Sequence, residues 1–366
     1  MPKGVLPHER WSYRMNAEAQ VARVVAAISP VDPTAEEAAR QRQDQLVKPK
    51  GSLGRVEELG IRLSAIARVC PPPVPRRPAV LVAAGDHGVL AQGVSPWPKE
   101  VTAAMVAGFC SETAAVNVIA GVVGAAVMVL DVGVASDLPP HPRLRVAKVR
   151  RGTADLLEGP AMTRPEAATA IVAGITAAND LIEAGADLLV TGDMGIANTT
   201  PAACLIAAFS GRDPAEVTGR GTGIDDETLE LKVKVVSRAL ELHDPDTCDP
   251  LGVLAAVGGL EHAALAGLIL AGAARGIPVI LDGVSAAAAA LAACAFAPHA
   301  LGYLIAGHRS VEPGASAALA KLGLDPLIDL GLRLGEGTGG LLAVPVVVAA
   351  AAVLANMATF AEAGIA

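Results

Sequence analysis

The sequence predicts an α/β fold: a three-layer α/β/α domain with a mainly parallel sheet, plus a smaller helical part. Short apolar runs, largely of β-branched residues, alternate along the chain with longer Ala-rich segments of helical character. Strands that are apolar throughout are typical of a parallel sheet covered by helices on both faces. The predicted strands are 79–84, 126–130, 187–190, 278–281 and 301–306, and the clearest helices are 166–184, 201–209, 260–275 and 285–296.

Each predicted strand ends abruptly at a polar or glycine residue. In a parallel α/β sheet the carboxyl ends of the strands share one edge, and ligands bind beyond that edge. Any one such residue, taken alone, is more often a cap or turn residue than a ligand contact. Five strands ending in this way favour a site, and the side chains concerned are Asp86, His87, Asp131, Asp193, Asp282 and His308.

The chain is long enough for one large domain, or for one large and one small domain. Its 366 residues are 52% hydrophobic but only 2% aromatic, which indicates closely packed helices rich in Ala, Val and Leu. The proline-rich segment 71–78 fits neither a helix nor a central strand and is a natural connector. Helices are predicted before it at 17–28, 35–47 and 56–68. We therefore expect a large α/β domain over 71–334 and a small helical domain formed by 1–70 together with 335–366.

Charge and composition exclude several classes of partner. A formal net charge of −8 argues against nucleic acid as a partner. The five cysteines form no CxxC pair and read as reduced thiols of a cytoplasmic protein. Met1–Trp11 lacks the apolar core of a signal peptide. The apolar run Leu341–Ala358 is interrupted by Pro345 and Asn356, so we expect a buried core helix and no membrane span.

The segment 193–201 (DMGIANTTP) follows a strand and opens a helix. We expect Thr199 or Thr200 to be the N-cap and Pro201 to be the first helical residue. Free amides and the positive end of the helix dipole would then face the sheet edge, where a phosphate or carboxylate can bind. An ordinary capped helix is an equally good interpretation of this segment alone.

Two further glycine-rich segments carry candidate chemistry. Residues 219–223 (GRGTG) precede a helix that contains Lys232 and resemble a phosphate cradle, although the segment is not a Walker A loop. Glu336 stands between glycines in 335–339 (GEGTG), where partial removal from water raises proton affinity and suits a general base. A turn acid near a helix N-terminus is the alternative. Asp86 and His87 are the one close pair of ligand types at a strand end, so no metal site is expected.

Seven motifs, in order along almost the whole chain, resemble the nicotinate-nucleotide–dimethylbenzimidazole phosphoribosyltransferase family, whose members make the lower-ligand nucleotide of cobalamin. The resemblance begins at about Ala17 and reaches the C-terminus. The motifs are 48–55 (KPKGSLGR), 84–89 (AGDHGV), 93–94 with 101–102, 192–200 (GDMGIANTT), 219–226 (GRGTGIDD), 307–310 (GHRS) with Glu312, and 333–339 (RLGEGTG).

The resemblance implies a reaction, a homodimer and a set of site residues. Nicotinate mononucleotide and 5,6-dimethylbenzimidazole would give α-ribazole phosphate and nicotinate, with small molecules as the substrates and no cofactor. Glu336 would be the general base, Asp193 would assist it, and Lys232 would be a further catalytic residue. The implied contacts to the nucleotide are Gly195, Asn198, Thr199, Asp282, Gly283, Ser285, His308 and Ser310, and those to the base are Trp97, Met105 and Leu334.

The chain departs from the family pattern at four positions. Asp193 replaces a commoner Glu, Ala197 stands where Gly is usual, Ala104 where Gln is frequent, and Trp97 where a smaller or phenolic residue is common. The last two changes can alter the choice of base. Two other functions stay open: a nucleotide-dependent oxidoreductase, which requires a GxGxxG turn that is not evident, and a non-catalytic sensor of α-ribazole or a related nucleotide, which is expected to lack Glu336.

Overall fold

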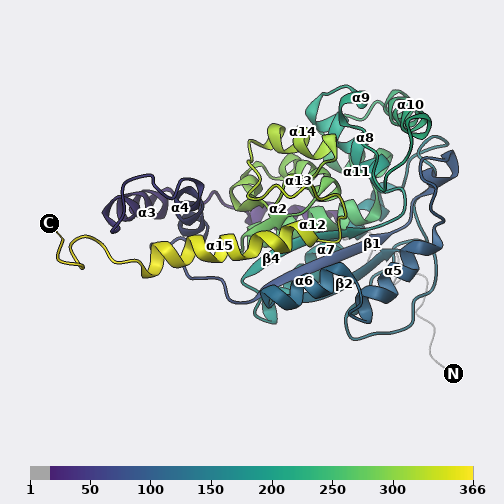
Figure 1. Ribbon diagram of the computed structural model, residues 1–366. Helices are drawn as coiled ribbons and strands as arrows, with labels where there is room; N and C mark the ends of the chain where they lie inside the picture. Colours follow the sequence, from purple (N-terminus) through teal and green to yellow (C-terminus); the bar gives the residue numbers. More distant parts are fainter. Residues whose placement is uncertain (1–16, 366) are drawn as a thin grey trace.

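The computed structural model describes residues 17–365, so the segment Met1–Trp11, for which we predicted no signal peptide, lies outside the described residues. A parallel sheet with strand order β3-β2-β1-β4-β5-β6 forms the centre (Figure 1). This order reverses direction between β1 and β4, and ligands of open α/β sheets bind at such a switch point. The predicted fold class is confirmed. The strands are β1 (Pro78–Gly85), β2 (Ala126–Gly133), β3 (Leu144–Val146), β4 (Leu188–Met194), β5 (Val279–Leu281) and β6 (Leu304–Ala306).

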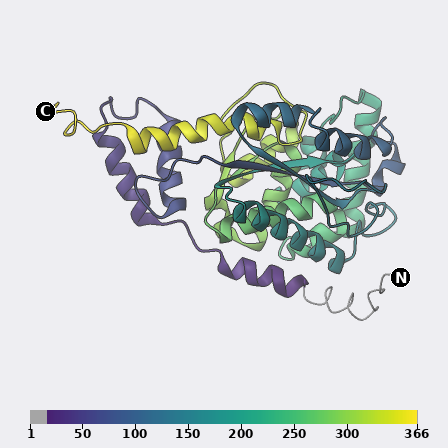
Figure 2. The ribbon, with the colours of Figure 1, turned by 90° about the horizontal axis from the view of Figure 1, so that it is seen from below.

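Helices cover both faces of the sheet, as Figure 2 shows with the sheet seen nearly edge-on. Alternate residues of β1 belong to different cores: Leu81 packs into the larger core on one face and Val82 into the core on the other. This alternation follows from the period of two in a strand. The larger core is formed with α7 (Arg164–Glu183), α8 (Thr199–Ser210), α11 (Pro250–Val257), α12 (Leu260–Ala274) and α13 (Val284–Phe296), and the other with α5 (Glu100–Cys110), α6 (Ala115–Val123) and α15 (Thr338–Asn356).

Small residues let two of these helices cross almost backbone to backbone. A Cβ atom on Gly174 of α7 would lie 1.8 Å from the carbonyl oxygen of Ala264 in α12, and one on Gly267 of α12 would lie 2.0 Å from that of Ile171 in α7. No side chain fits at either position. The Ala- and Gly-rich, ring-poor composition is therefore what such close helix packing requires.

The first and last helices join the sheet domain in different ways. α2 (Ala17–Ala27) lies against α7 and α12, whereas α3 (Pro33–Gln45) and α4 (Arg55–Ala67) pack with α15. A small separate core of Ala39, Leu46, Ile61 and Leu354 joins α3, α4 and the end of α15 (Figure 1). Near its start, at Gly340, α15 instead lies against Val190 of β4 and Ile280 of β5. The proposed division at residues 71 and 334 stays a prediction.

Around the outer rim, α10 (Asp226–His243) packs on α8, and α14 (Pro313–Leu322) packs on α13. The remaining short helices are α9 (Pro214–Val217) and the 3₁₀ turns η1 (Gly88–Gln92) and η2 (Pro298–Tyr303).

Three local predictions were wrong. The edge strand β3 was missed, because its three residues are partly exposed and form no apolar run. The predicted strand 301–306 begins only at Leu304, since the residues before it belong to η2. The N-cap of α8 is Asn198, which makes Thr199 the first helical residue and leaves Pro201 in the third position.

Two helical segments are long and apolar enough to cross a membrane by length and composition alone. Thr338–Asn356 is 56% buried over its apolar window and covers the sheet, as expected for a core helix. Glu100–Val123 is not one continuous helix, because α5 ends at Cys110 and α6 starts at Ala115. Its window is 28% buried, and one face of α6 exposes Val118 and Val122.

Candidate active site

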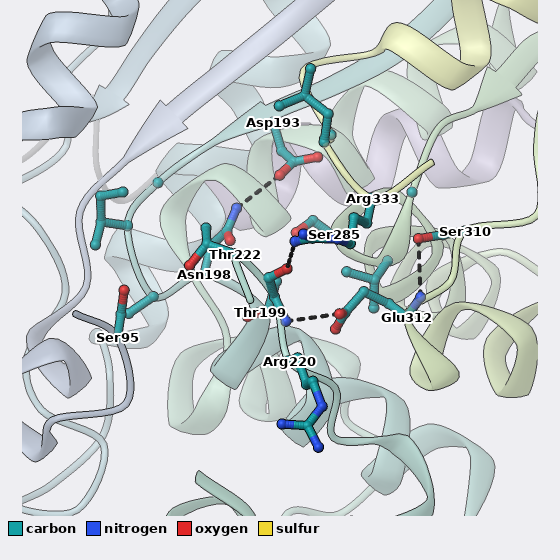
Figure 3. A pocket seen from close by; sticks show the side chains of 18 of the residues that line it. Ser95, Asp193, Asn198, Thr199, Arg220, Thr222, Ser285, Ser310, Glu312 and Arg333 are labelled. Carbon is teal, nitrogen blue, oxygen red and sulfur yellow. Dashed lines mark hydrogen bonds between the residues drawn. The ribbon is translucent and has the colours of Figure 1, made fainter. Parts of the chain in front are cut away.

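A cavity opens at the carboxyl edge of the sheet, where the polar strand ends predicted a site (Figure 3). Its wall comes from the turns that follow β4, β5 and β6 and from two glycine-rich segments. All six polar residues predicted at the strand ends are buried, and Asp193 and His308 line the cavity itself. The lining segments are 94–95, 193–199, 220–222, 283–285 and 333–335, with Ile224, Lys232, His308, Ser310 and Glu312.

The turn from β4 into α8 holds Asp193 in a fixed position. Asp193 is 8% exposed, and its Oδ2 accepts a hydrogen bond of 2.8 Å from Asn198 Nδ2 (Figure 3). This bond explains why Asn198 does not cap α8 with its side chain. Ala197 has φ of 71°, a left-handed conformation that costs a non-glycine residue about 1–2 kcal/mol. A glycine at this position would avoid that cost.

Gly195 has no space for a side chain, so a single methyl group there should disturb the site. A Cβ atom would lie 2.2 Å from the carbonyl oxygen of Gly85 and 3.0 Å from His87 Nε2. We expect Gly195→Ala to displace Asp193 and to lower kcat/KM by about 10²-fold, since a shift of about 1 Å has that effect on reacting groups. Gly121→Ala in α6, where a Cβ meets nothing within 4 Å, is the matched control and should leave kcat/KM unchanged. Equal kinetics for the two variants would contradict the prediction.

The loop before α15 carries Glu336 in an unusual backbone conformation. Gly335, Glu336 and Gly337 all have positive φ, at 83°, 64° and 93°. Asp282 fixes this loop, because its Oδ2 accepts from Gly337 N at 3.0 Å and its Oδ1 from Gly340 N at 2.9 Å. Glu336 is 3% exposed, and within residues 17–365 its Oε2 has no hydrogen-bond partner.

Three carboxyl groups gather at this point, and burial together with like charge raises the proton affinity of Glu336 and Asp193. Burial first, and then the charges of Asp193 and Asp282, raise the pKa of Glu336 to about 7. Burial and Asp282 likewise raise the pKa of Asp193 to about 6. Asp193 is also close to the Glu336 loop, since a Cβ on Gly335 would lie 3.5 Å from both of its carboxylate oxygens. Closely placed carboxyl groups with raised pKa values are typical of acid–base sites.

Lys232 of α10 provides a positive charge in the cavity wall. Its side chain is buried, and Nζ donates to Thr199 Oγ1 at 2.7 Å and to the carbonyl oxygen of Gly219 at 2.9 Å. An ammonium group has three donors, so one remains for an anion in the cavity. Burial lowers the pKa of Lys232 to about 8, although the nearby charge of Glu312 acts in the opposite direction.

The structure brings most of the predicted site residues to one cavity. Four predicted residues are not part of its lining. Glu336 lies in the loop before α15, and Asp282 accepts hydrogen bonds from that loop. Trp97 is 50% exposed, and Met105 packs against the core on the α5 side of the sheet. The predicted residues that line it are Asp193, Gly195, Asn198, Thr199, Lys232, Gly283, Ser285, His308, Ser310 and Leu334.

Several residues of the site had no predicted role. Ser95 lines the cavity but is an ordinary polar loop residue with no sequence signal of its own. Arg220, Thr222 and Arg333 also line it and were noted only as parts of the glycine-rich motifs. Glu312 was noted only as part of a motif. Within the described chain, no group of three or more His, Cys, Asp or Glu side chains is arranged to hold a metal ion.

A buried ionic cluster beneath the β4–α8 turn was also missed. Glu261 Oε1 lies 3.0 Å from His87 Nε2 and 3.0 Å from His262 Nδ1, and all three side chains are at most 1% exposed. Within the described residues, neither imidazole makes a hydrogen bond of good geometry to the carboxylate, so the cluster rests on close contact between the three groups. At the start of a helix, Glu261 has the appearance of an ordinary first-turn acid, which is why no sequence pattern indicates the cluster.

Comparison with known proteins identifies the family of the chain. A family model described as phosphoribosyltransferase matches residues 28–365, and the chain belongs to this family. The Salinispora tropica protein named nicotinate-nucleotide–dimethylbenzimidazole phosphoribosyltransferase is 59% identical over 358 residues, which cover 94% of this chain and 98% of that protein. The Chloroflexus aggregans protein of the same name is 56% identical, over 92% and 96% of the two chains. A crystal structure of the Thermus thermophilus protein of that name has a TM-score of 0.87 at 50% identity, covering 92% of this chain and 99% of its own.

Proposed function

We propose that this protein transfers the 5-phosphoribosyl group of nicotinate mononucleotide to 5,6-dimethylbenzimidazole, giving α-ribazole 5′-phosphate and nicotinate. The names of relatives at 59% and 56% identity support this choice of substrates. The observation that carries the chemistry is Glu336, a buried carboxylate with an unpartnered oxygen and a pKa raised to about 7. A general base works best when its pKa is near the working pH.

A single general base is enough for this reaction. The nicotinate ring leaves from a pyridinium, so the nucleotide already carries a cationic leaving group, and neither an acid nor a metal ion is required to expel it. One nitrogen of the benzimidazole attacks C1′ from the α face as nicotinate departs, with inversion at that carbon. The other nitrogen loses its proton to Glu336.

Other residues of the site bind and orient the nucleotide. Lys232, Thr199 and Ser310 line the cavity and supply donors for the phosphate. Asp193 raises the basicity of Glu336 through its charge, so its shorter side chain need not touch the base. The rest of the cavity wall on the nucleotide side is formed by Gly195, Asn198, Gly283, Ser285 and His308. Asp282 holds the loop that carries Glu336. Leu334, Trp97 and Met105 are proposed for the base side.

The proposal is tested by mixing the protein with nicotinate mononucleotide and dimethylbenzimidazole and following nicotinate release by chromatography. We expect release only when both substrates are present, with α-ribazole phosphate formed in equal amount. A protein that binds the nucleotide but releases no nicotinate would support the alternative, a non-catalytic sensor. The presence of Glu336 disfavours that alternative.

We further propose a cytoplasmic homodimer. The five cysteines are all unpaired, which fits a reducing compartment. Val118 is 63% and Val122 83% exposed on α6, and exposed apolar side chains on one helix face favour burial against a second copy.

A further inference from the structure

Glu312 is a buried carboxylate in the cavity wall with no part in the proposed chemical step. It lies between β6 and α14, is 6% exposed, and its backbone N–H donates to Ser310 Oγ at 3.3 Å (Figure 3). Its Oε1 accepts a hydrogen bond of 2.8 Å from the backbone N–H of Gly221. Its Oε2 faces Gly219, where a Cβ atom would lie only 2.1 Å away. The carboxylate is therefore pressed against the glycine loop 219–223.

This contact changes the interpretation of the loop. The sequence predicts a phosphate cradle, in which free backbone amides face an anion. Here the central amide is already taken by a carboxylate, and a phosphate placed at the same amide would meet like charge. The Gly221 amide is therefore not available to an anion. The free donor of Lys232 is the better partner for a phosphate.

The same loop also determines where Lys232 points. The carbonyl oxygen of Gly219 accepts from Lys232 Nζ, and the carbonyl oxygen of Gly221 accepts from Arg333 Nη1 at 3.0 Å. Lys232 reaches across from α10 and is otherwise bound only to Thr199 within residues 17–365. The position of its ammonium group thus depends on the position of Gly219, and Glu312 lies against Gly219 and binds Gly221 in the same loop.

We propose that Glu312 is a positioning residue for nucleotide binding: it fixes the loop 219–223 through Gly221 and so aims Lys232 at the phosphate of the nucleotide. The inference rests on the proposed function for the identity of that nucleotide. It predicts an effect on the affinity for nicotinate mononucleotide and none on the affinity for the benzimidazole.

Three variants at position 312 distinguish the effect of side-chain length from the effect of side-chain charge. Glu312→Ala leaves the Gly221 amide without its acceptor and should raise the KM for nicotinate mononucleotide about 10- to 100-fold, with the KM for dimethylbenzimidazole changed less than about 2-fold. Glu312→Gln keeps a carbonyl oxygen at the same reach and should stay within about 3-fold of the original protein. Glu312→Asp keeps the charge but is too short, so it should behave like the alanine variant. It also replaces the alanine variant if the latter fails to fold.

Hydrogen exchange of the peptide covering 219–224 in the ligand-free protein tests whether Glu312 holds the loop, independently of any catalytic activity. Exchange should be faster in the Ala and Asp variants than in the Gln variant and the original protein. Equal exchange in all four proteins overturns the inference, as does an equal rise in both KM values or a Gln variant as impaired as Ala. If the original protein itself releases no nicotinate, the proposed function fails, and the exchange experiment still decides whether Glu312 holds the loop.

Discussion

Replacing Glu336 with glutamine is expected to lower turnover by about 10²–10⁴-fold while leaving nucleotide binding nearly unchanged. Glutamine has the same size and the same backbone preferences, but its amide cannot take the proton from the attacking benzimidazole. The measurement is kcat from nicotinate release, together with the affinity for nicotinate mononucleotide from calorimetry. Glu58→Gln, an exposed change on α4, is the control and should leave both values unchanged.

The pH dependence of the original protein provides a second test of the same role. The base must be deprotonated to act, so kcat/KM should rise with pH through about 7 and level off above it, as the raised pKa of Glu336 requires. Asp193, whose pKa is raised to about 6, lies close to Glu336. The pH at which kcat/KM rises therefore reflects both carboxyl groups and not Glu336 alone. Full activity in Glu336→Gln, or a profile flat from pH 5 to 9, would remove Glu336 from the mechanism.

The sheet and its site edge were predictable because both leave simple patterns in the sequence. Strands such as β1 are apolar on both faces and stop at a polar residue, as a buried parallel strand must. β3 leaves no such pattern, since an edge strand of three partly exposed residues buries too little to constrain its composition. α5 and α6 were missed for another reason. The run Glu100–Val123 is apolar nearly throughout, and no Gly or Pro within Ser111–Ala114 marks the point where one helix ends and the next begins.

The sequence allowed candidate residues to be chosen by their chemical type. It did not allow the contacts between distant parts of the chain to be predicted. Glu336 and Lys232 were singled out because an acid among glycines and a lysine after a glycine-rich turn are distinctive, and their catalytic roles stay predictions. The positive φ of Glu336 and the two amide bonds of Asp282 were not foreseeable, because both depend on how the loop before α15 meets β5. The bond from Gly221 to Glu312 joins residues far apart in the chain, which no local pattern records.

The cluster around Glu261 sets the largest expected effect on stability. Glu261→Gln removes the negative charge that two buried imidazoles face at 3.0 Å, and we expect it to lower the free energy of unfolding by about 3–5 kcal/mol. The measurement is urea denaturation followed by circular dichroism at pH 5.5. Glu230→Gln, the same change at an exposed site on α10, is the control and should alter the free energy by less than about 0.5 kcal/mol.

The loss of stability in Glu261→Gln should depend on pH, because it requires a charged Glu261 and a charged His87. Burial alone would raise the pKa of Glu261, but the two imidazoles outweigh it and lower that pKa, so its contribution is complete above pH 4.5 and is lost as the pH falls through the lowered value. Burial alone would lower the pKa of His87, but Glu261 and Asp86 outweigh it and raise that pKa. The contribution of His87 is then complete below pH 6.5 and is lost as the pH rises through the raised value. The difference between the original protein and Glu261→Gln should therefore be largest between pH 4.5 and 6.5 and shrink above that range. A difference below about 1 kcal/mol, or one that is constant from pH 5 to 9, would mean that the cluster is held by packing and not by charge.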